Sequence, residues 1–213
     1  MKLKKIINIK KIMKLKTGLR IASGNDEIKI GGIDNSIVKD PFTGNPYIPG
    51  SSLKGVLRSS LEIAKGKTKV CDCGDCFICK MFGSANNDKK SITRIIVRDA
   101  FLTEKSRQIL NEVLPFGVEI KNENSIDRVK GTSAGKRTFD RVPAGAEFEV
   151  NIVLKIFEKD DEEEFLKALE LAFKLVEFNY VGGCGSRGYG QVEFKDEQIE
   201  YFDVEEEVKK VLR

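Results

Sequence analysis

AEFEVNIVLKIFE (residues 146–158) and DDEEEFLKALELAFKLVEF (residues 160–178) stand almost next to each other in the chain and carry its clearest structural signal. In the first segment apolar and polar residues alternate, which predicts a half-buried strand. In the second, apolar residues recur at helical spacing, and the acidic first turn complements the helix dipole. Together they predict a strand that leads directly into a helix.

The flanking segments extend this pattern to six elements. A Gly-rich loop, VGGCGSRGYG, leads from the helix into a short strand, QVEF. Three further elements precede the pair: a long strand in residues 3–21, a helix in residues 51–66 and a strand in residues 92–102. The order strand, helix, strand, strand, helix, strand is that of the split βαβ, ferredoxin-like fold. We expect an α+β fold in a single domain, residues 1–213, with two large insertions.

Composition places the chain among globular proteins, with 40% hydrophobic and 33% charged residues and a net charge of +4. Its apolar runs are too short for a membrane span, and its Lys-rich start is unlike a secretory signal, so we expect a cytoplasmic protein without a membrane partner. The first twenty residues carry eight Lys or Arg and no acid. This bias suits a polyanion such as nucleic acid, or equally a basic strand that faces water.

CDCGDCFIC, residues 71–79, holds four of the five cysteines, and the chain has no histidine. Four thiolates at this spacing are the ligand set of a closed, structural Zn²⁺ site, so Cys71, Cys73, Cys76 and Cys79 are candidate ligands. The two overlapping CxxC pairs also allow a redox or iron–sulfur role, or four cysteines without a metal. Because a closed site has no open coordination position, the zinc interpretation favours a scaffold over a catalyst.

Gly183, Gly185 and Gly188 have GxGxxG spacing, but they follow a helix and precede a strand, which is the reverse of the dinucleotide-binding context. The glycines permit close approach of backbone N–H groups to a phosphate beside Arg187, or they form a tight turn without a ligand. The chain also lacks a P-loop, which argues against nucleotide hydrolysis of that class.

The lack of histidine removes the commonest general base and every Ser-His or Cys-His dyad. Proton transfer must then use Asp, Glu, Lys, Tyr, Cys or a metal-bound water. Asp34 lies in the loop sequence IGGIDNSIVKDP, where a carboxylate can be presented to a substrate. The alternative is that Asp34 simply forms a turn.

Four segments together resemble a known family. They are IGGIDNSIVKDPFTGNPYIPGSSLKGVLRSSLE, CKMFGS, SIDRVKGTSAGKRTFDRVPAGAEFEV and VGGCGSRGYGQVEF. In this order they resemble the RAMP proteins of CRISPR systems, most closely the repeated backbone subunit of the type III-A (Csm) effector complex. The resemblance implies a ferredoxin-like, RRM-related core with a zinc-binding insertion (residues 66–91) and a thumb hairpin (residues 119–143).

The resemblance also implies a function. Subunits of this kind stack head to tail along a CRISPR guide RNA, beside other effector subunits, and each thumb kinks the guide and the complementary target RNA. Asp34 matches the aspartate needed to cut the target, with a divalent cation such as Mg²⁺. The expected RNA-binding residues are Arg20, Ser51, Ser52, Lys54, Arg58, Lys130, Lys136, Arg137, Gly183, Gly185, Arg187 and Gly188. Relatives often have a histidine among the zinc ligands, and this chain departs from them there.

The helix that begins near Ser51 supports this interpretation independently. Ser51 or Ser52 can cap its free N–H groups, while Lys54 and Arg58 share one face. A helix N-terminus, hydroxyls and two cations form a surface on which phosphates can dock without sequence readout. Two other functions remain open: a non-catalytic structural subunit of an RNA-bound filament, and a zinc-dependent or redox-active single-strand-binding protein outside CRISPR.

Overall fold

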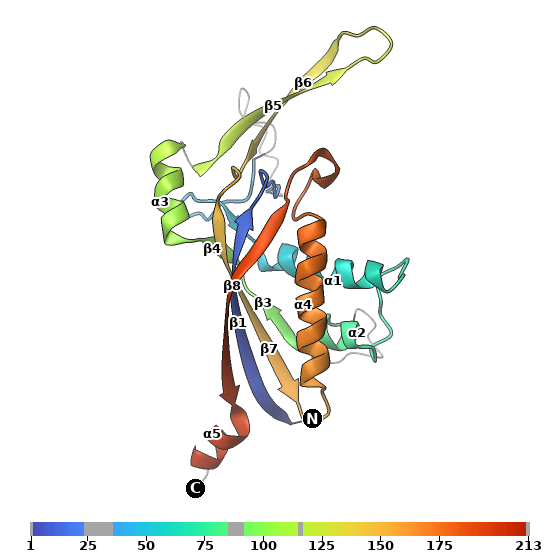
Figure 1. Ribbon diagram of the computed structural model, residues 1–213, viewed down its shortest axis with the longest axis vertical. Helices are drawn as coiled ribbons and strands as arrows, with labels where there is room; N and C mark the ends of the chain where they lie inside the picture. Colours follow the sequence, from blue (N-terminus) through green and yellow to red (C-terminus); the bar gives the residue numbers. More distant parts are fainter. Residues whose placement is uncertain (1, 24–35, 85–91, 115–116, 212–213) are drawn as a thin grey trace.

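The computed structural model describes residues 2–23, 36–84, 92–114 and 117–211. The elements are, in chain order, β1 (Leu3–Leu15), β2 (Tyr47–Ile48), α1 (Gly50–Ala64), α2 (Phe77–Phe82), β3 (Ile95–Val97), β4 (Ala100–Leu102), α3 (Glu104–Val113), β5 (Glu119–Ile126), β6 (Ser133–Arg141), β7 (Glu147–Phe157), α4 (Glu162–Phe178), a 3₁₀ turn (Gly185–Arg187), β8 (Val192–Asp203) and α5 (Val204–Val211). Figure 1 shows a twisted sheet with the helices α1, α2 and α4 on one side and a hairpin that projects from one end.

The main sheet has the strand order β2-β4-β7-β1-β8, and β3 also pairs with β7. Every pairing is antiparallel, with β1 and β7 joined along most of their length. Alternate side chains of these two strands, such as Ile7 and Phe148, are fully buried and pack with the apolar faces of α1 and α4. The mixed α and β architecture expected from the sequence is confirmed.

Four elements differ from the sequence expectation. The single strand expected at residues 92–102 is two short strands, interrupted at Arg98 and Asp99. The short strand expected at residues 191–194 continues as β8 to Asp203, because it stays paired with β1 as far as Lys5. The helices α3 and α5 were not expected at all.

The β5–β6 hairpin is a separate two-stranded sheet. It lies within the range expected to form a thumb and projects away from the main sheet (Figure 1). Most of its side chains are exposed, but Phe139 and Asp140 at its base are buried. The base is therefore fixed to the body, while the outer part offers both faces to a partner.

In the part of the chain that the structure describes, no helix is both long enough and apolar enough to cross a membrane.

Candidate functional site

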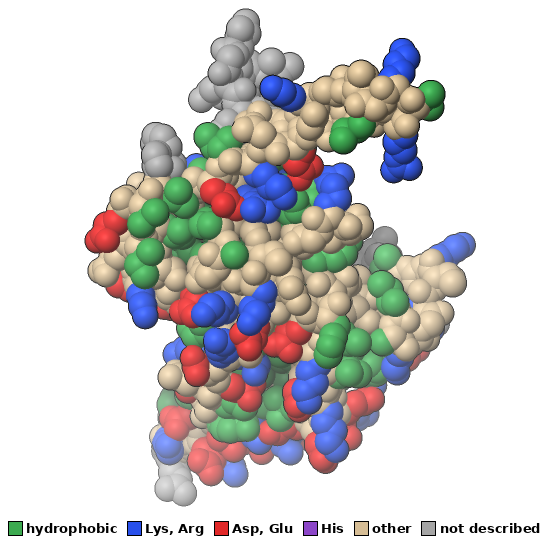
Figure 2. Space-filling model, turned by 45° about the horizontal axis from the view of Figure 1, so that its top comes forward, with side chains coloured by type: hydrophobic (Ala, Val, Ile, Leu, Met, Phe, Trp, Pro, Cys, Tyr) green, Lys and Arg blue, Asp and Glu red, His purple; other side chains and the backbone are tan. Residues whose placement is uncertain are grey.

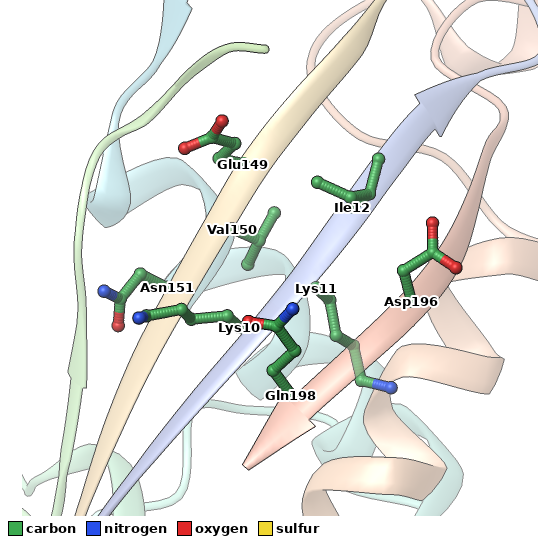
Figure 3. Close-up of a pocket in the computed structure, with 8 residues that line it drawn as sticks. All are labelled: Lys10, Lys11, Ile12, Glu149, Val150, Asn151, Asp196 and Gln198. Carbon is green, nitrogen blue, oxygen red and sulfur yellow. The ribbon is translucent and has the colours of Figure 1, made fainter. Parts of the chain in front are cut away.

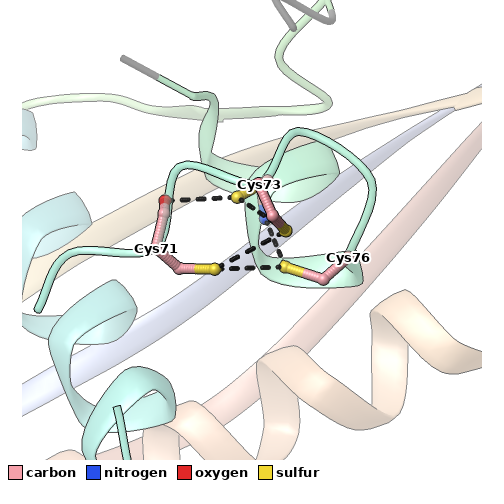
Figure 4. A group of neighbouring side chains, drawn as sticks. Cys71, Cys73 and Cys76 are labelled. Carbon is pink, nitrogen blue, oxygen red and sulfur yellow. Dashed lines mark hydrogen bonds between the residues drawn. The ribbon is translucent and has the colours of Figure 1, made fainter. Parts of the chain in front are cut away.

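The four cysteines of the expected metal site converge in the structure. Their sulfur atoms all lie within 4.8 Å of one another, and three Sγ to Sγ distances are 3.7, 3.7 and 3.8 Å (Figure 4). A tetrahedron with metal–sulfur bonds of about 2.3 Å has edges of about 3.8 Å. The spacing of the sulfurs therefore fits one tetrahedral metal ion, and the cluster can bind one.

The cluster's thiols differ in acidity because their surroundings differ. Hydrogen bonds from the backbone N–H groups of Cys76 and Asp75 lower the pKa of Cys73 to about 6. Burial raises the pKa of Cys79 to about 12 and also raises that of Cys76. Since metals bind thiolates, the exposed Cys73 is the thiol most readily available as a first ligand at neutral pH.

The start of α1 is built differently from the expectation. The helix begins at Gly50 with Pro49 as its N-cap residue, and neither Ser51 nor Ser52 caps it. Asp99, from the turn between β3 and β4, accepts a hydrogen bond of 2.7 Å from the N–H of Gly50 instead. A Cβ at Gly50 would lie 2.3 Å from the carbonyl oxygen of Val97, so only glycine allows this approach. The cap residue expected from the sequence was wrong because the acceptor comes from a distant part of the chain.

Lys54 and Arg58 have different environments although they lie one turn apart on α1. Burial, and then the charge of Arg58, lowers the pKa of Lys54, and no carboxylate among the described residues forms an ion pair with it. Arg58 instead pairs with Glu62 and donates to two backbone carbonyls near the cysteines. Lys54 thus keeps an uncompensated charge, whereas the charge of Arg58 is already paired.

Asp34, the expected catalytic residue, lies outside the described residues. On either side of its segment, the hydroxyls of Ser23 and Ser36 lie 3.0 Å apart, and Ile37 donates its N–H to the buried carboxylate of Asp140 at 2.9 Å. Ile37 also lines a small hollow with Tyr47, which lies three residues before α1. The structure therefore brings the residues next to this segment close to the hairpin base and the start of α1.

The Gly-rich loop packs against the segment that follows β1 and against the hairpin. Gly183 donates its N–H to the carbonyl of Arg20 at 2.8 Å, and a Cβ at Gly185 would lie 2.1 Å from the Tyr180 ring. A Cβ at Gly188, in contrast, would meet nothing within 4 Å. Protein packing thus explains the glycine at position 185, in agreement with the tight-turn alternative. A Cβ at Gly183 would make only an ordinary contact, 3.8 Å from the carbonyl oxygen of Arg20, and the space at Gly188 is open.

Cationic and aromatic groups surround the junction of this loop with the hairpin. The guanidinium carbon of Arg20 lies 4.9 Å from the centre of the Phe139 ring, and its Nε is buried without a hydrogen-bond partner among the described residues. Arg187 is about half exposed and donates to the sulfur of Cys184. Tyr189 is buried and donates to Glu123 of β5 at 2.5 Å.

The hairpin's expected RNA-binding residues are exposed. Lys130 lies in the turn, Lys136 and Arg137 lie on β6, and no ion pair is formed by them within the described ranges. Figure 2 shows Lys and Arg side chains on both sides of the tip of the projecting hairpin. These charges are free to contact a polyanion.

The basic N-terminal strand is neutralised within the protein. Six lysines of this strand and of the residues directly flanking it pair with acidic residues of neighbouring elements: Lys2 with Glu205, Lys5 with Glu162, Lys10 with Glu200, Lys11 with Glu197, Lys14 with Glu147 and Lys16 with Glu193. The geometry supports the interpretation as a basic strand facing water, and it does not support a nucleic-acid site along β1.

A hollow of about 370 Å³ lies over β1, β7 and β8 and is lined by polar groups such as Lys10, Asn151 and Gln198 (Figure 3). Its two carboxylates, Glu149 and Asp196, come from β7 and β8 and are separated by β1. They do not converge as a pair of acids would have to for a metal ion or for acid–base catalysis.

Three residues that shape the site were not singled out in the sequence: Asp99, Asp140 and Tyr189. Each acts across a long sequence separation, from Asp99 to Gly50, from Asp140 to Ile37 and from Tyr189 to Glu123. Only Tyr189 had a local signal, an aromatic residue inside a glycine cluster.

Comparisons with known proteins agree with the resemblance stated above. The CRISPR system Cms endoribonuclease Csm3 of Methanocaldococcus jannaschii is 42% identical over 217 residues, which cover 93% of this chain and 84% of that protein. The protein of the same name from Methanothermobacter thermautotrophicus is 40% identical over 89% of this chain and 84% of its own length. The one from Streptococcus thermophilus is 36% identical over 86% of this chain and 84% of its own length.

A solved structure is also similar. A chain in the crystal structure of the Csm3–Csm4 subcomplex of the type III-A CRISPR-Cas interference complex matches with a TM-score of 0.65 and 30% identity, over 98% of this chain and 85% of that chain. Residues 12–193 match the family described as the RAMP superfamily. With most of its length matched, the chain belongs to the RAMP superfamily.

Proposed function

We propose that this chain is the repeated backbone subunit of a type III CRISPR effector complex, which binds guide RNA and cleaves the complementary target RNA at regular intervals. One observation carries the proposal: 42% identity, over 93% of the chain, to a protein named as a CRISPR endoribonuclease. The core is then a split βαβ, ferredoxin-like domain, with residues 66–91 as its zinc-binding insertion and residues 119–143 as its thumb.

The proposed reaction needs no histidine. The 2′-oxygen of a target nucleotide loses its proton and attacks the neighbouring phosphorus, and the bond from phosphorus to the 5′-oxygen breaks. The leaving 5′-oxygen takes a proton from water, so the products carry a cyclic phosphate and a 5′-hydroxyl. Asp34 accepts the proton of the 2′-hydroxyl or holds a divalent cation. A cation such as Mg²⁺ would supply neutralisation of the phosphate charge.

The guide-binding surface combines α1 with the hairpin junction. Lys54 is partly desolvated and lacks an acidic partner among the described residues, which suits a phosphate contact. Ser51 and Ser52 lie beside it in the first turn of α1. The second part of the guide-binding surface, at the hairpin junction, consists of Arg20, the Gly-rich loop and Arg187. Contacts of this kind hold the backbone of any guide sequence.

The hairpin would act on the duplex of guide and target. Lys130, Lys136 and Arg137 extend its positive charge beyond the body, where it can reach the paired strands. An exposed hairpin with a buried base can displace one nucleotide, which frees its 2′-hydroxyl to align with the adjacent phosphate.

The four cysteines would hold a structural Zn²⁺. Their sulfur spacing matches the expected tetrahedral edges, and four protein ligands leave no coordination position for a substrate. Zinc would stabilise the loop between α1 and β3, which is otherwise built on the short helix α2. The redox alternative would require disulfides to form between these cysteines in the working protein.

The matching structure is a subcomplex of Csm3 with a different subunit, Csm4, and it supports the proposal that this chain has protein partners. We propose that copies of this chain stack head to tail along the guide RNA in the cytoplasm, with other effector subunits at the ends. A repeated heterologous contact that does not close produces a helical filament.

The test compares assembled complexes that carry wild-type chain, Asp34→Ala or, as a matched control from the same segment, Asp26→Ala. Labelled complementary RNA is added with Mg²⁺, and binding and cleavage are measured separately. We expect all three to bind the target equally and only Asp34→Ala to lose cleavage. If all three complexes bind the target equally and none of them cleaves it, this chain is a non-catalytic scaffold. If Asp34→Ala cleaves at the wild-type rate, Asp34 does not have its proposed role.

A further inference from the structure

Arg58 and Glu62 form a largely buried ion pair next to the cysteine loop. They lie four residues apart on α1, with 2.9 Å between Arg58 Nε and Glu62 Oε1. Their side chains are only 19% and 9% exposed. A charged pair this far from solvent is costly unless its remaining hydrogen-bonding groups also find partners.

Those partners are both ends of the loop that carries the cysteines. Glu62 Oε1 accepts a hydrogen bond of 3.0 Å from the N–H of Cys71, and Arg58 Nη2 donates to the carbonyl of Cys71 at 2.6 Å. Arg58 Nη1 donates to the carbonyl of Gly83 at 3.0 Å. Gly83 directly follows α2, the helix that carries Cys79. The pair therefore fixes the backbone of Cys71 on both sides and joins it to the end of α2.

Metal binding would change which groups donate hydrogen bonds to the carbonyl of Cys71. The carbonyl of Cys71 also accepts a bond of 3.2 Å from the Cys79 thiol. A metal-bound cysteine is a thiolate and has no proton to donate, so of these two donors only Arg58 persists in the metal-bound protein. Groups that hydrogen-bond to metal-binding residues and orient them are typically needed for full metal affinity.

We propose that Arg58 and Glu62 are positioning residues of the four-cysteine metal site, an inference that rests on the zinc site proposed above. Arg58 thus holds the metal-binding loop on α1, and contact with guide phosphates falls to Lys54, one turn earlier. Three of the five N–H groups of Arg58 are engaged with protein acceptors, and its charge is paired with Glu62.

The test uses the full chain with three substitutions: Arg58→Lys, Glu62→Gln and the control Lys54→Gln from the same helix. Zinc affinity is measured by competition with a coloured chelator, and guide-RNA affinity is measured on the same preparations. Lysine keeps the charge but cannot bridge two carbonyls and a carboxylate, so we expect zinc affinity to fall roughly 10- to 100-fold in Arg58→Lys.

We expect a smaller loss in Glu62→Gln, since its amide oxygen can still accept the N–H of Cys71. Lys54→Gln should keep wild-type zinc affinity and bind guide RNA more weakly. Wild-type zinc affinity in both Arg58→Lys and Glu62→Gln would overturn the inference. A wild-type chain that binds no zinc would instead refute the proposed metal site. If Arg58→Lys does not fold even with excess zinc, Glu62→Gln alone decides the question.

Discussion

Tyr189 shows how one residue joins the Gly-rich loop to the hairpin. Its hydroxyl donates to Glu123 of β5, while Lys121 and Arg141 place their charges 4.6 and 4.9 Å from the centre of its ring. Burial, followed by the hydrogen bond to Glu123, raises the pKa of Tyr189 to about 12. The folded protein therefore favours the neutral phenol, and ionisation of Tyr189 weakens the junction.

This residue predicts a dependence of stability on alkaline pH. An unfolded tyrosine ionises near pH 10, below the folded value of about 12, so the stabilisation is complete below pH 10 and is lost as the pH rises through that interval. At about pH 8, Tyr189→Phe should lower the free energy of unfolding by about 1 kcal/mol. Urea unfolding of both proteins should show this difference shrinking toward about pH 12. A difference that does not change with pH would contradict the assignment.

At the scale of elements, the Gly-rich loop depends on close backbone packing. Gly190 has φ +74°, and a Cβ there would lie 2.0 Å from the carbonyl oxygen of Val181. Gly188 has a similar φ of +82°, but a Cβ there would meet no atom within 4 Å. The two glycines have similar positive φ angles and differ in crowding, which makes them a matched pair.

Gly188→Ala should cost only the conformational strain, roughly 1–2 kcal/mol. Gly190→Ala should cost clearly more, because the methyl group overlaps a backbone carbonyl that cannot rotate away. Chemical denaturation of the two variants measures both costs. Equal losses would show that the loop does not pack on Val181 as described.

Elements with strong local patterns could be predicted from the sequence. The strand expected at 146–158 is β7, and the helix expected at 160–178 is α4, which begins two residues later. Other boundaries depend on distant residues: the expected strand at 92–102 breaks because Asp99 turns to cap α1. The charged sequence of β8 continues as a strand because it stays paired with β1 as far as Lys5, with Lys10 and Lys11 of β1 beside its glutamates, and no local pattern reveals this pairing.

The same limit applies to the candidate site. The cysteine cluster could be predicted, because its four cysteines lie within nine residues of one another. The environments of Lys54 and Arg58 could not, since helical spacing places both on one face and does not show that Arg58 reaches Cys71 and Gly83. Side chains with the same charge can therefore have different roles on the same helix.

At the scale of the whole molecule, the hairpin and α5 lie at opposite ends of the long axis (Figure 1). Different surfaces at the two ends suit a head-to-tail arrangement of copies, in which every copy has the same position relative to its neighbour. In the proposed filament each copy contributes one hairpin and one Asp34. The cutting sites should therefore be separated by a constant number of target nucleotides.

The decisive measurement is the cleavage pattern of a long, end-labelled complementary RNA on the assembled wild-type complex, resolved on a denaturing gel with Mg²⁺ or EDTA. We expect an evenly spaced ladder with Mg²⁺ that disappears in EDTA, because each copy cuts its own interval and needs a cation to neutralise the phosphate. Intact target RNA that is bound by the complex in the presence of Mg²⁺, or a single cut regardless of target length, would contradict a repeated, cleaving subunit.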